Sequence, residues 1–121
     1  MNLNTIFKAQ SIVLLINAIG GLFLTTTFLE AANFTVTSDM ITLGQFIGTT
    51  FLILAIWSWR LPDVVGESIK SVGMLFAIGG LLWTIIIGYH IAIGAAAGLT
   101  AYANIILTAI FALGFYFYSR S

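Results

Sequence analysis

Five polar side chains, spread over otherwise apolar stretches, have the most scope for chemistry in this chain: Glu30, Gln45, Tyr89, His90 and Asn104. Each lies near the same predicted boundary of its stretch, so the five share one depth if the stretches are membrane-spanning helices. A Glu30 carboxylate near the His90 imidazole could bind a divalent cation, hold a proton near neutral pH, or orient a polar headgroup or a small ligand that enters from outside. Ionisable residues in membrane spans are candidates for function by default, whereas a lone histidine there is often only a hydrogen-bonded structural residue.

The rest of the sequence argues against enzymatic chemistry. The chain has no cysteine and one histidine, and it contains no nucleophile elbow, phosphate-binding loop or zinc-protease motif. One histidine and one or two carboxylates on separate helices match no metal-ligand spacing, and nothing further supports a tetrapyrrole on His90. We therefore expect no enzyme activity, no catalytic residue, no metal and no cofactor. With only two basic residues, the segment from Arg60 to Lys70 is also a poor candidate for binding anionic lipid or nucleic acid.

The segments that carry the five polar residues are long enough and apolar enough to cross a membrane. From Ser71 to Ser119 the chain runs forty-nine residues without Lys, Arg, Asp or Glu, and its mean hydropathy is +1.11. A helix needs about 20 apolar residues to cross a bilayer, so this run predicts two crossings. The two glycines of Gly94–Gly98 weaken the helix at its middle and predict the turn between the crossings.

Two further charge-free runs precede this pair, from Ala9 to Leu29 and from Met40 to Trp59. The sequence therefore predicts an all-α integral membrane four-helix bundle in one domain, residues 1–121, with helices over about 9–29, 40–59, 71–93 and 99–118. A membrane β-barrel is excluded because no segment alternates apolar and polar residues. The segment from Arg60 to Lys70 is expected to be a solvated linker, with Pro62 suited to the first position of a helix.

The basic residues predict the orientation. With four crossings, Lys8, Arg60, Lys70 and Arg120 all fall on one side, and the positive-inside rule makes that side cytoplasmic. Both termini are therefore expected to face the cytoplasm. Aromatic residues that favour the headgroup region agree with this orientation, because they lie at the same predicted ends of the second and fourth helices: Trp57, Trp59, Tyr116 and Tyr118.

The two halves of the chain resemble each other. Ala18–Leu22 reappears as Ala77–Leu81 fifty-nine residues later, and the same offset aligns Gln45 with Asn104. Such halves would be two parallel helical hairpins related by an axis along the membrane normal. Chains built from few residue types also match by chance, so duplication and coincidence both stay open.

Small and polar residues recur at intervals of three and four along each predicted helix, which places them on one face. Because lipid is as apolar as leucine, membrane helices associate through close packing of small residues and interhelical hydrogen bonds, at about 1 kcal/mol per bond. We therefore expect these faces to turn inward and hold the bundle together. The residues assigned to this packing are Asn17, Gly21, Gly48, Gly80, Thr84, Gly88 and Thr108.

The layout resembles a known group of proteins. The first predicted helix ends in Phe28–Glu30, the second contains Leu43–Gly48 and ends in Trp57–Arg60, and a proline-containing loop, a Gly-Gly third helix and a short glycine-rich turn follow. This order is similar to that of small four-helix prokaryotic membrane proteins of unknown function that are distantly DoxX-like. The resemblance covers nearly the whole chain and implies the fold and a prokaryotic inner or plasma membrane, without implying an activity.

Two functions fit these features. The first is a non-catalytic accessory or structural subunit, which uses its small-residue faces to associate with other membrane proteins or with copies of itself within the lipid bilayer. The alternative is a protein that handles a small ligand or an ion through the polar cluster at the outer end of the bundle. The first is favoured because the small and polar faces suffice for assembly and no deeply buried charge marks a permeation path.

Overall fold

The computed structural model describes residues 2–120, and they are almost entirely helical. The expected all-α class is confirmed, and the described range contains no strand. The single domain predicted over residues 1–121 also includes Met1 and Ser121, which lie outside that range. The elements in chain order are α1 (Leu3–Phe23), α2 (Thr25–Ala31), α3 (Ser38–Val65), the short 3-10 helix η1 (Gly66–Ser68), α4 (Ile69–Ala92) and α5 (Gly98–Ser119).

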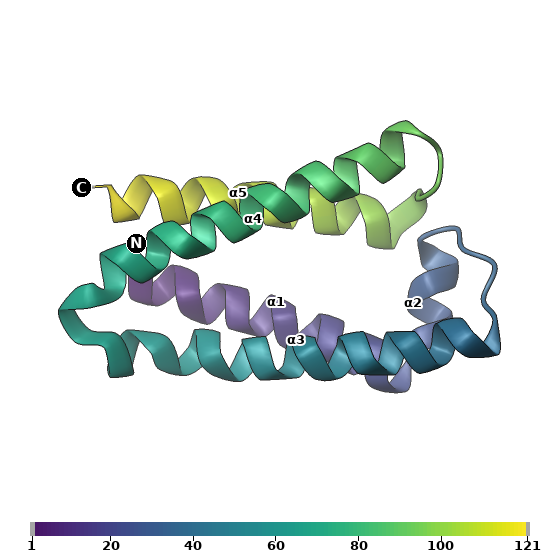
Figure 1. Ribbon diagram of the computed structural model, residues 1–121, viewed down its shortest axis with the longest axis horizontal. Coiled ribbons are helices and arrows are strands. Elements are labelled where there is room, and N and C mark those ends of the chain that lie inside the picture. Colours follow the sequence, from purple (N-terminus) through teal and green to yellow (C-terminus); the bar gives the residue numbers. More distant parts are fainter. Residues whose placement is uncertain (1, 121) are drawn as a thin grey trace.

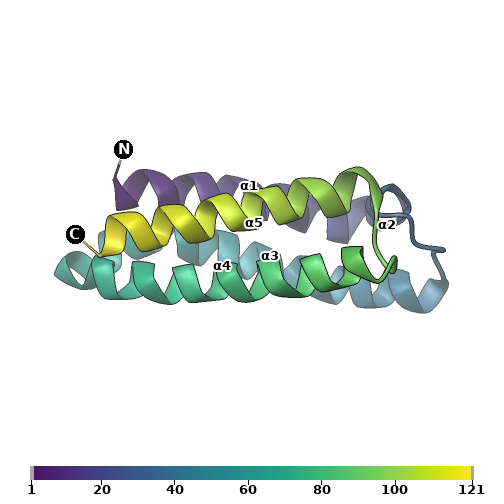
Figure 2. The same ribbon diagram turned by 90° about the horizontal axis from the view of Figure 1, so that it is seen from above.

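Three helical stretches are long and apolar enough to cross a membrane: Leu3–Phe23, Ser38–Ala92 and Gly98–Ser119. The middle stretch contains both α3 and α4, and the chain reverses at η1 between them (Figure 1). Four long helices therefore lie side by side in one bundle. The termini and η1 lie at one end, called here the termini end, and α2 lies at the opposite end, called the α2 end (Figures 1 and 2).

The four long helices form two hairpins. α1 packs along α3 and α4 packs along α5, whereas α3 and α4 have little contact and diverge from η1 (Figure 1). α1 and α4 run in the same direction, so the hairpins are parallel, as the internal repeat predicts. The bundle is thus two tight pairs of helices that are loosely joined to each other.

In the first hairpin, two glycines bring the helix backbones together. A Cβ added to Gly21 would lie 2.8 Å from the Gly44 carbonyl oxygen and 2.9 Å from the Gly48 Cα, and a Cβ on Gly48 would lie 2.9 Å from the backbone of Gly21 and Leu22. The Ser11 hydroxyl also donates to the Ala55 carbonyl at 2.6 Å. α1 and α3 therefore approach so closely that neither glycine position has room for a side chain.

The second hairpin is built in the same way. A Cβ on Gly80 would lie 3.0 Å from the Ala112 Cβ, and the Thr84 hydroxyl donates to the Gly80 carbonyl and lies 3.1 Å from the Thr108 hydroxyl of α5. Gly21 and Gly80, which the repeat aligns, both lie where the two helices of their hairpin meet. The correspondence between the halves therefore extends from sequence to packing.

The first helix differs from its expected bounds at both ends. It begins at Leu3 because the Asn2 side chain accepts a hydrogen bond from the Thr5 N–H at 3.0 Å and caps the first turn. It ends at Phe23, where Leu24 has non-helical backbone angles (φ −128°, ψ 34°), and the chain continues as the separate helix α2. The predicted helix over 9–29 is therefore two helices, and α2 turns toward the second hairpin (Figure 1).

The expected linker between Arg60 and Lys70 is mostly helical. α3 continues to Val65, with Pro62 buried in its last turns, and only the three residues of η1 separate it from α4. Pro62 thus lies near the end of a helix. The sequence had predicted that it would lie at the first position of one. The reversal occurs at Gly66, whose φ of +55° favours glycine. The glycine-rich turn between α4 and α5 is confirmed, with positive φ at Gly94 and Gly98.

An aromatic cluster joins the two hairpins at the termini end. The ring of Phe7 from α1 meets Phe76 of α4 edge-on at 5.0 Å and Phe115 of α5 at 4.8 Å between centroids. Leu3, Ile6 and Ala77 complete this buried core. The side chains of Phe7 and Phe115 are fully buried, so this end of the bundle is closed by packed aromatic rings.

The glycine contact in the first hairpin makes a stability prediction. Gly48→Ala should destabilise the protein by about 2 kcal/mol, because the new methyl group forces α1 away from α3. The matched control is Gly79→Ala in α4, where an added Cβ meets nothing within 4 Å. Unfolding in mild detergent should show a clear loss for Gly48→Ala and little change for Gly79→Ala. Equal losses would contradict the close approach.

Candidate functional site: a chamber between the hairpins

A cavity lies between the two hairpins, in the middle of the bundle. Its volume is about 680 Å³, within the roughly 300–1,000 Å³ typical of ligand pockets. We call it the central chamber. Helices α1 to α5 all contribute residues to its wall, including the aromatic side chains Phe28, Phe51, Phe76, Trp83 and Phe111.

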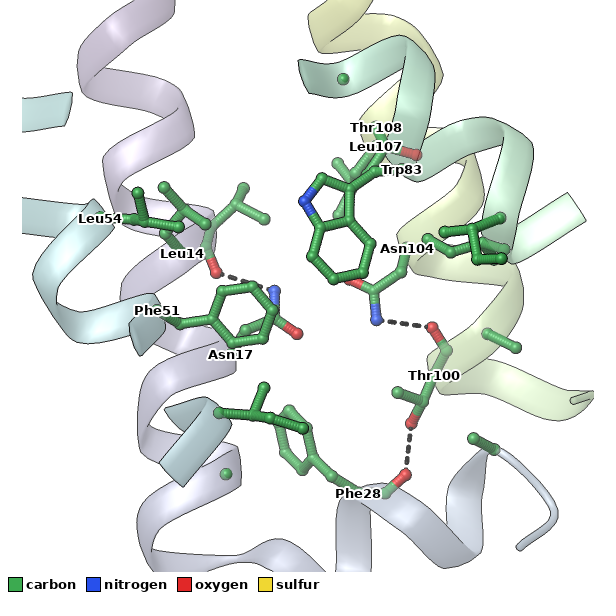
Figure 3. A pocket seen from close by; sticks show the side chains of 18 of the residues that line it. Leu14, Asn17, Phe28, Phe51, Leu54, Trp83, Thr100, Asn104, Leu107 and Thr108 are labelled. Atoms are coloured by element: carbon green, nitrogen blue, oxygen red, sulfur yellow. Dashed lines mark hydrogen bonds between the residues drawn. The ribbon is translucent and has the colours of Figure 1, made fainter. Parts of the chain in front are cut away.

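The chamber exists because bulky side chains face each other across it. Leu14 and Leu54 extend from the first hairpin, and Trp83 and Leu107 extend from the second (Figure 3). The small residues that allow close approach are used mainly inside each hairpin, so the hairpins cannot meet along their middle. The rings of Phe51 and Trp83, with centroids 6.0 Å apart, form an aromatic contact across the gap between α3 and α4.

Two asparagine amides face the chamber from opposite walls. Asn17 of α1 and Asn104 of α5 both point into the space between the hairpins (Figure 3). Each amide donates one hydrogen bond to its own helix, from Asn17 to the Val13 carbonyl at 3.0 Å and from Asn104 to the Thr100 carbonyl at 2.9 Å. Neither amide oxygen accepts a hydrogen bond from residues 2–120, so both oxygens are available to a ligand.

The α2 end of the chamber is held shut by contacts to the backbone of α2. The Thr100 hydroxyl donates to the Phe28 carbonyl at 2.9 Å, and the Ala97 N–H donates to the Ala32 carbonyl at 3.1 Å. Gly98 lies against the Ala31 carbonyl oxygen with a φ of +85°, a position that has no space for a Cβ. These contacts form a latch, the α2 latch, between the turn before α5 and the end of α2.

Of the five residues predicted to form a ligand cluster, the structure places two on the chamber. Asn104 lies in its wall, and His90 lines it near the α2 end, where the Ala95 and Ala96 N–H groups donate to the His90 carbonyl. Tyr89 packs edge-on against the His90 ring at 5.2 Å, but its own side chain is 57% exposed and does not line the chamber.

Glu30 and Gln45 do not join this site. Both side chains are exposed, and neither lines the central chamber. The expected cluster of five is therefore not assembled, because α2 departs from the axis of α1 and because Gln45 lies on a face of α3 away from the chamber. Within residues 2–120 no three His, Asp or Glu residues come close enough to hold a metal ion.

The residues assigned to helix packing separate into two groups. Gly21, Gly48, Gly80, Thr84 and Thr108 lie at the contacts within the hairpins, and a Cβ on Gly88 would lie 3.4 Å from the Ile105 side chain in the same interface. Asn17 differs, because its amide bonds only to its own helix and faces the chamber. Like Asn104, Asn17 therefore contributes to the chamber wall and not to a contact between helices.

Sequence reasoning did not identify Phe51, Trp83 and Thr100 as part of a site. Aromatic side chains and threonine are both common in membrane helices, so the types of these three residues carry no signal. A usable signal was present for Asn17, because Asn17 and Asn104 are the asparagines that lie inside predicted spans. Among residues 2–120 the chamber wall contains no Asp, Glu, Lys or Arg, so the arrangement is suited to binding and offers no carboxylate for acid or base catalysis.

Comparison with protein-family models, with curated proteins and with solved structures returned no match. The resemblance to DoxX-like proteins therefore stays a prediction from layout, and the function has to be argued from the chamber itself.

The α2 latch makes a second stability prediction. Thr100→Val keeps the side-chain shape but loses the bond to the Phe28 carbonyl, so it should cost about 1 kcal/mol and speed hydrogen exchange in α2. Thr49→Val is the control, because the Thr49 hydroxyl is exposed and bonds within its own helix to the Gln45 carbonyl. If the two variants unfold alike and α2 exchanges at the same rate, the latch contributes nothing.

Proposed function

We propose that this protein is a non-catalytic integral membrane protein that binds a neutral, amphiphilic small molecule between its two hairpins. The observation that carries this proposal is the central chamber, an apolar space of ligand size with two amides facing each other across it. An apolar wall with a few convergent polar groups is the usual composition of a small-molecule site.

The composition of the wall selects the class of ligand. A charged molecule would lack a partner there, because no acidic or basic side chain other than His90 lines the chamber within the described residues. Phe51, Trp83 and Phe111 offer apolar and aromatic surface, while Asn17 and Asn104 each offer a free carbonyl oxygen and a second N–H. The ligand should therefore have a ring or chain body and one or two hydroxyl or carbonyl groups.

Access to the chamber is proposed to run between α3 and α4. Side chains on this side line the chamber and are about half exposed, as for Ile47 at 52% and Trp83 at 47%. On the opposite side α1 and α5 are joined by the Phe7–Phe115 contact. A ligand dissolved in the membrane would then pass the Phe51–Trp83 pair sideways without crossing water.

A role as an accessory subunit, the function favoured by the sequence, is the second candidate. It relies on small-residue faces that are free to bind a partner. Gly21, Gly48, Gly80 and Thr84 are occupied by contacts within their own hairpins, which favours the ligand-binding proposal. Native mass spectrometry of the protein from its own membrane separates the two roles, because a subunit retains protein partners and a binding protein retains a small molecule.

Ligand binding can be measured with Trp83 as the reporter. A variant with Trp57→Phe and Trp59→Phe leaves Trp83 as the sole tryptophan, and a brominated long-chain alcohol serves as a quenching probe. Quenching should saturate, and Asn17→Leu with Asn104→Leu should weaken apparent binding about tenfold through loss of two hydrogen bonds.

The control for this experiment is a variant that keeps only Trp57, which is exposed and lies outside the chamber. Its quenching should rise without saturation as the probe partitions into the detergent. Gly79→Phe should also remove the saturable phase at Trp83, because Gly79 lines the chamber and has open space at its Cβ position. The proposal fails if Trp83 and Trp57 are quenched alike.

The membrane orientation is proposed from the same structure. Lys8, Arg60, Lys70 and Arg120 would lie in the cytoplasm together with both termini, following the positive-inside rule. The chain has no cysteine, so single cysteines can report sidedness. In intact cells a membrane-impermeant maleimide should label Thr35→Cys and spare Ser68→Cys, which should react only after the membrane is opened. The reverse pattern would invert the orientation.

A further inference from the structure

A second, shallower groove runs along the outer face of the first hairpin, away from the central chamber. It has a volume of about 320 Å³ and lies between α1 and α3. The Ser11–Ala55 hydrogen bond closes its floor, and the apolar side chains Ile12, Leu15 and Ile56 form its walls. These wall residues are between 42% and 55% exposed, so the groove is accessible from outside the bundle.

Two basic residues, Lys8 and Arg60, lie where the groove opens toward the termini end of the bundle. The Lys8 Nζ lies 4.4 Å from the centroid of the Trp59 ring, and both Trp59 and Arg60 line the groove. Neither Lys8 nor Arg60 forms an ion pair with any residue from 2 to 120, although Asp63 and Glu67 belong to the same end of the bundle. Two positive charges are therefore held beside an apolar groove without a carboxylate to neutralise them.

We propose that this groove, the Lys8–Arg60 groove, binds an anionic phospholipid. The phosphate would lie between Lys8 and Arg60, Trp59 would lie at the level of the headgroup, and one acyl chain would lie along Ile12, Leu15 and Ile56. This inference goes beyond the proposed function, because the groove is separate from the central chamber and takes a charged ligand that the chamber does not suit.

Charge and shape together favour a lipid over a free phosphate. The wall continues for two turns from Arg60 to Leu52, about 12 Å along the helix axis, and it contains no charge beyond the cationic end. A soluble anion would use the two cations and leave this apolar length uncovered. Tryptophan and basic residues at a membrane boundary are also the usual partners of lipid headgroups. The predicted cytoplasmic leaflet is the one that contains anionic lipid.

The test is lipid retention in native mass spectrometry. The full chain in mild detergent is mixed with equal amounts of phosphatidylglycerol and phosphatidylcholine, and retained lipid is compared between variants. The wild-type chain should prefer phosphatidylglycerol about tenfold, since each basic residue near a headgroup contributes attraction. Lys8→Gln with Arg60→Gln should remove this preference, whereas Lys8→Arg with Arg60→Lys should keep it.

The matched control removes two charges from the second hairpin at the same end, through Lys70→Gln with Arg120→Gln, and should keep the preference. If both double glutamine variants lose it equally, the attraction is a general charge effect and the proposal is overturned.

A second arm separates lipid from free phosphate. Ile56→Trp fills the groove while leaving both cations in place, and it should reduce phosphatidylglycerol retention severalfold. Glycerol phosphate, the headgroup without acyl chains, should not compete. Retention that is unchanged by Ile56→Trp, or competition by glycerol phosphate, would show that the acyl chain does not occupy the groove. Circular dichroism of every variant should match the wild-type helix content.

Discussion

The close approach of two helix backbones within each hairpin is the constraint on which the rest of this structure depends. In lipid, helices gain little by burying apolar side chains against one another, so close packing decides which helices pair. Gly21 with Gly48, and Gly80 with Ala112, satisfy that condition within the hairpins. The large side chains between the hairpins prevent such close packing, and the unfilled space between the hairpins becomes the central chamber. Strong pairing inside the halves and weak pairing between them thus have one physical origin.

The two ends of the bundle keep the hairpins together by different means. At the termini end, the rings of Phe7, Phe76 and Phe115 pack edge-on and tilted, with centroids 4.8 to 5.5 Å apart. At the α2 end, the Thr100 hydroxyl and the Ala97 N–H bond to carbonyls of the α2 segment. A chamber closed at both ends and bounded at the sides by loosely associated helices can admit a ligand sideways while its ends stay fixed. This arrangement is why a lateral route is more consistent with the fold than a route along the bundle axis.

The sequence was enough to predict the helical class and the glycine-rich turn, because these follow from hydropathy and from the placement of glycine. The pairing into two hairpins was suggested by the internal repeat. The sequence did not predict the break at Leu24, since neither proline nor glycine occupies that position and the preceding Gly20-Gly21 pair equally suits close packing. It placed Pro62 in a linker because the charged segment from Arg60 to Lys70 separates two apolar runs, whereas α3 continues through Pro62 to Val65. Because α2 departs from the axis of α1, Glu30 does not reach the chamber and the predicted cluster lacks its carboxylate. Asn104 stays in the site, and the Asn17 amide joins it there.

The α2 latch also bears on how this protein can change over evolutionary time. Its acceptors are the main-chain carbonyls of Phe28, Ala31 and Ala32, which every amino acid possesses. Sequence drift at these three positions can therefore alter the side chains without removing a single latch contact. Selection would act instead on Gly98 and Thr100 across the joint, so two homologues could share this closure while showing no recognisable similarity along α2.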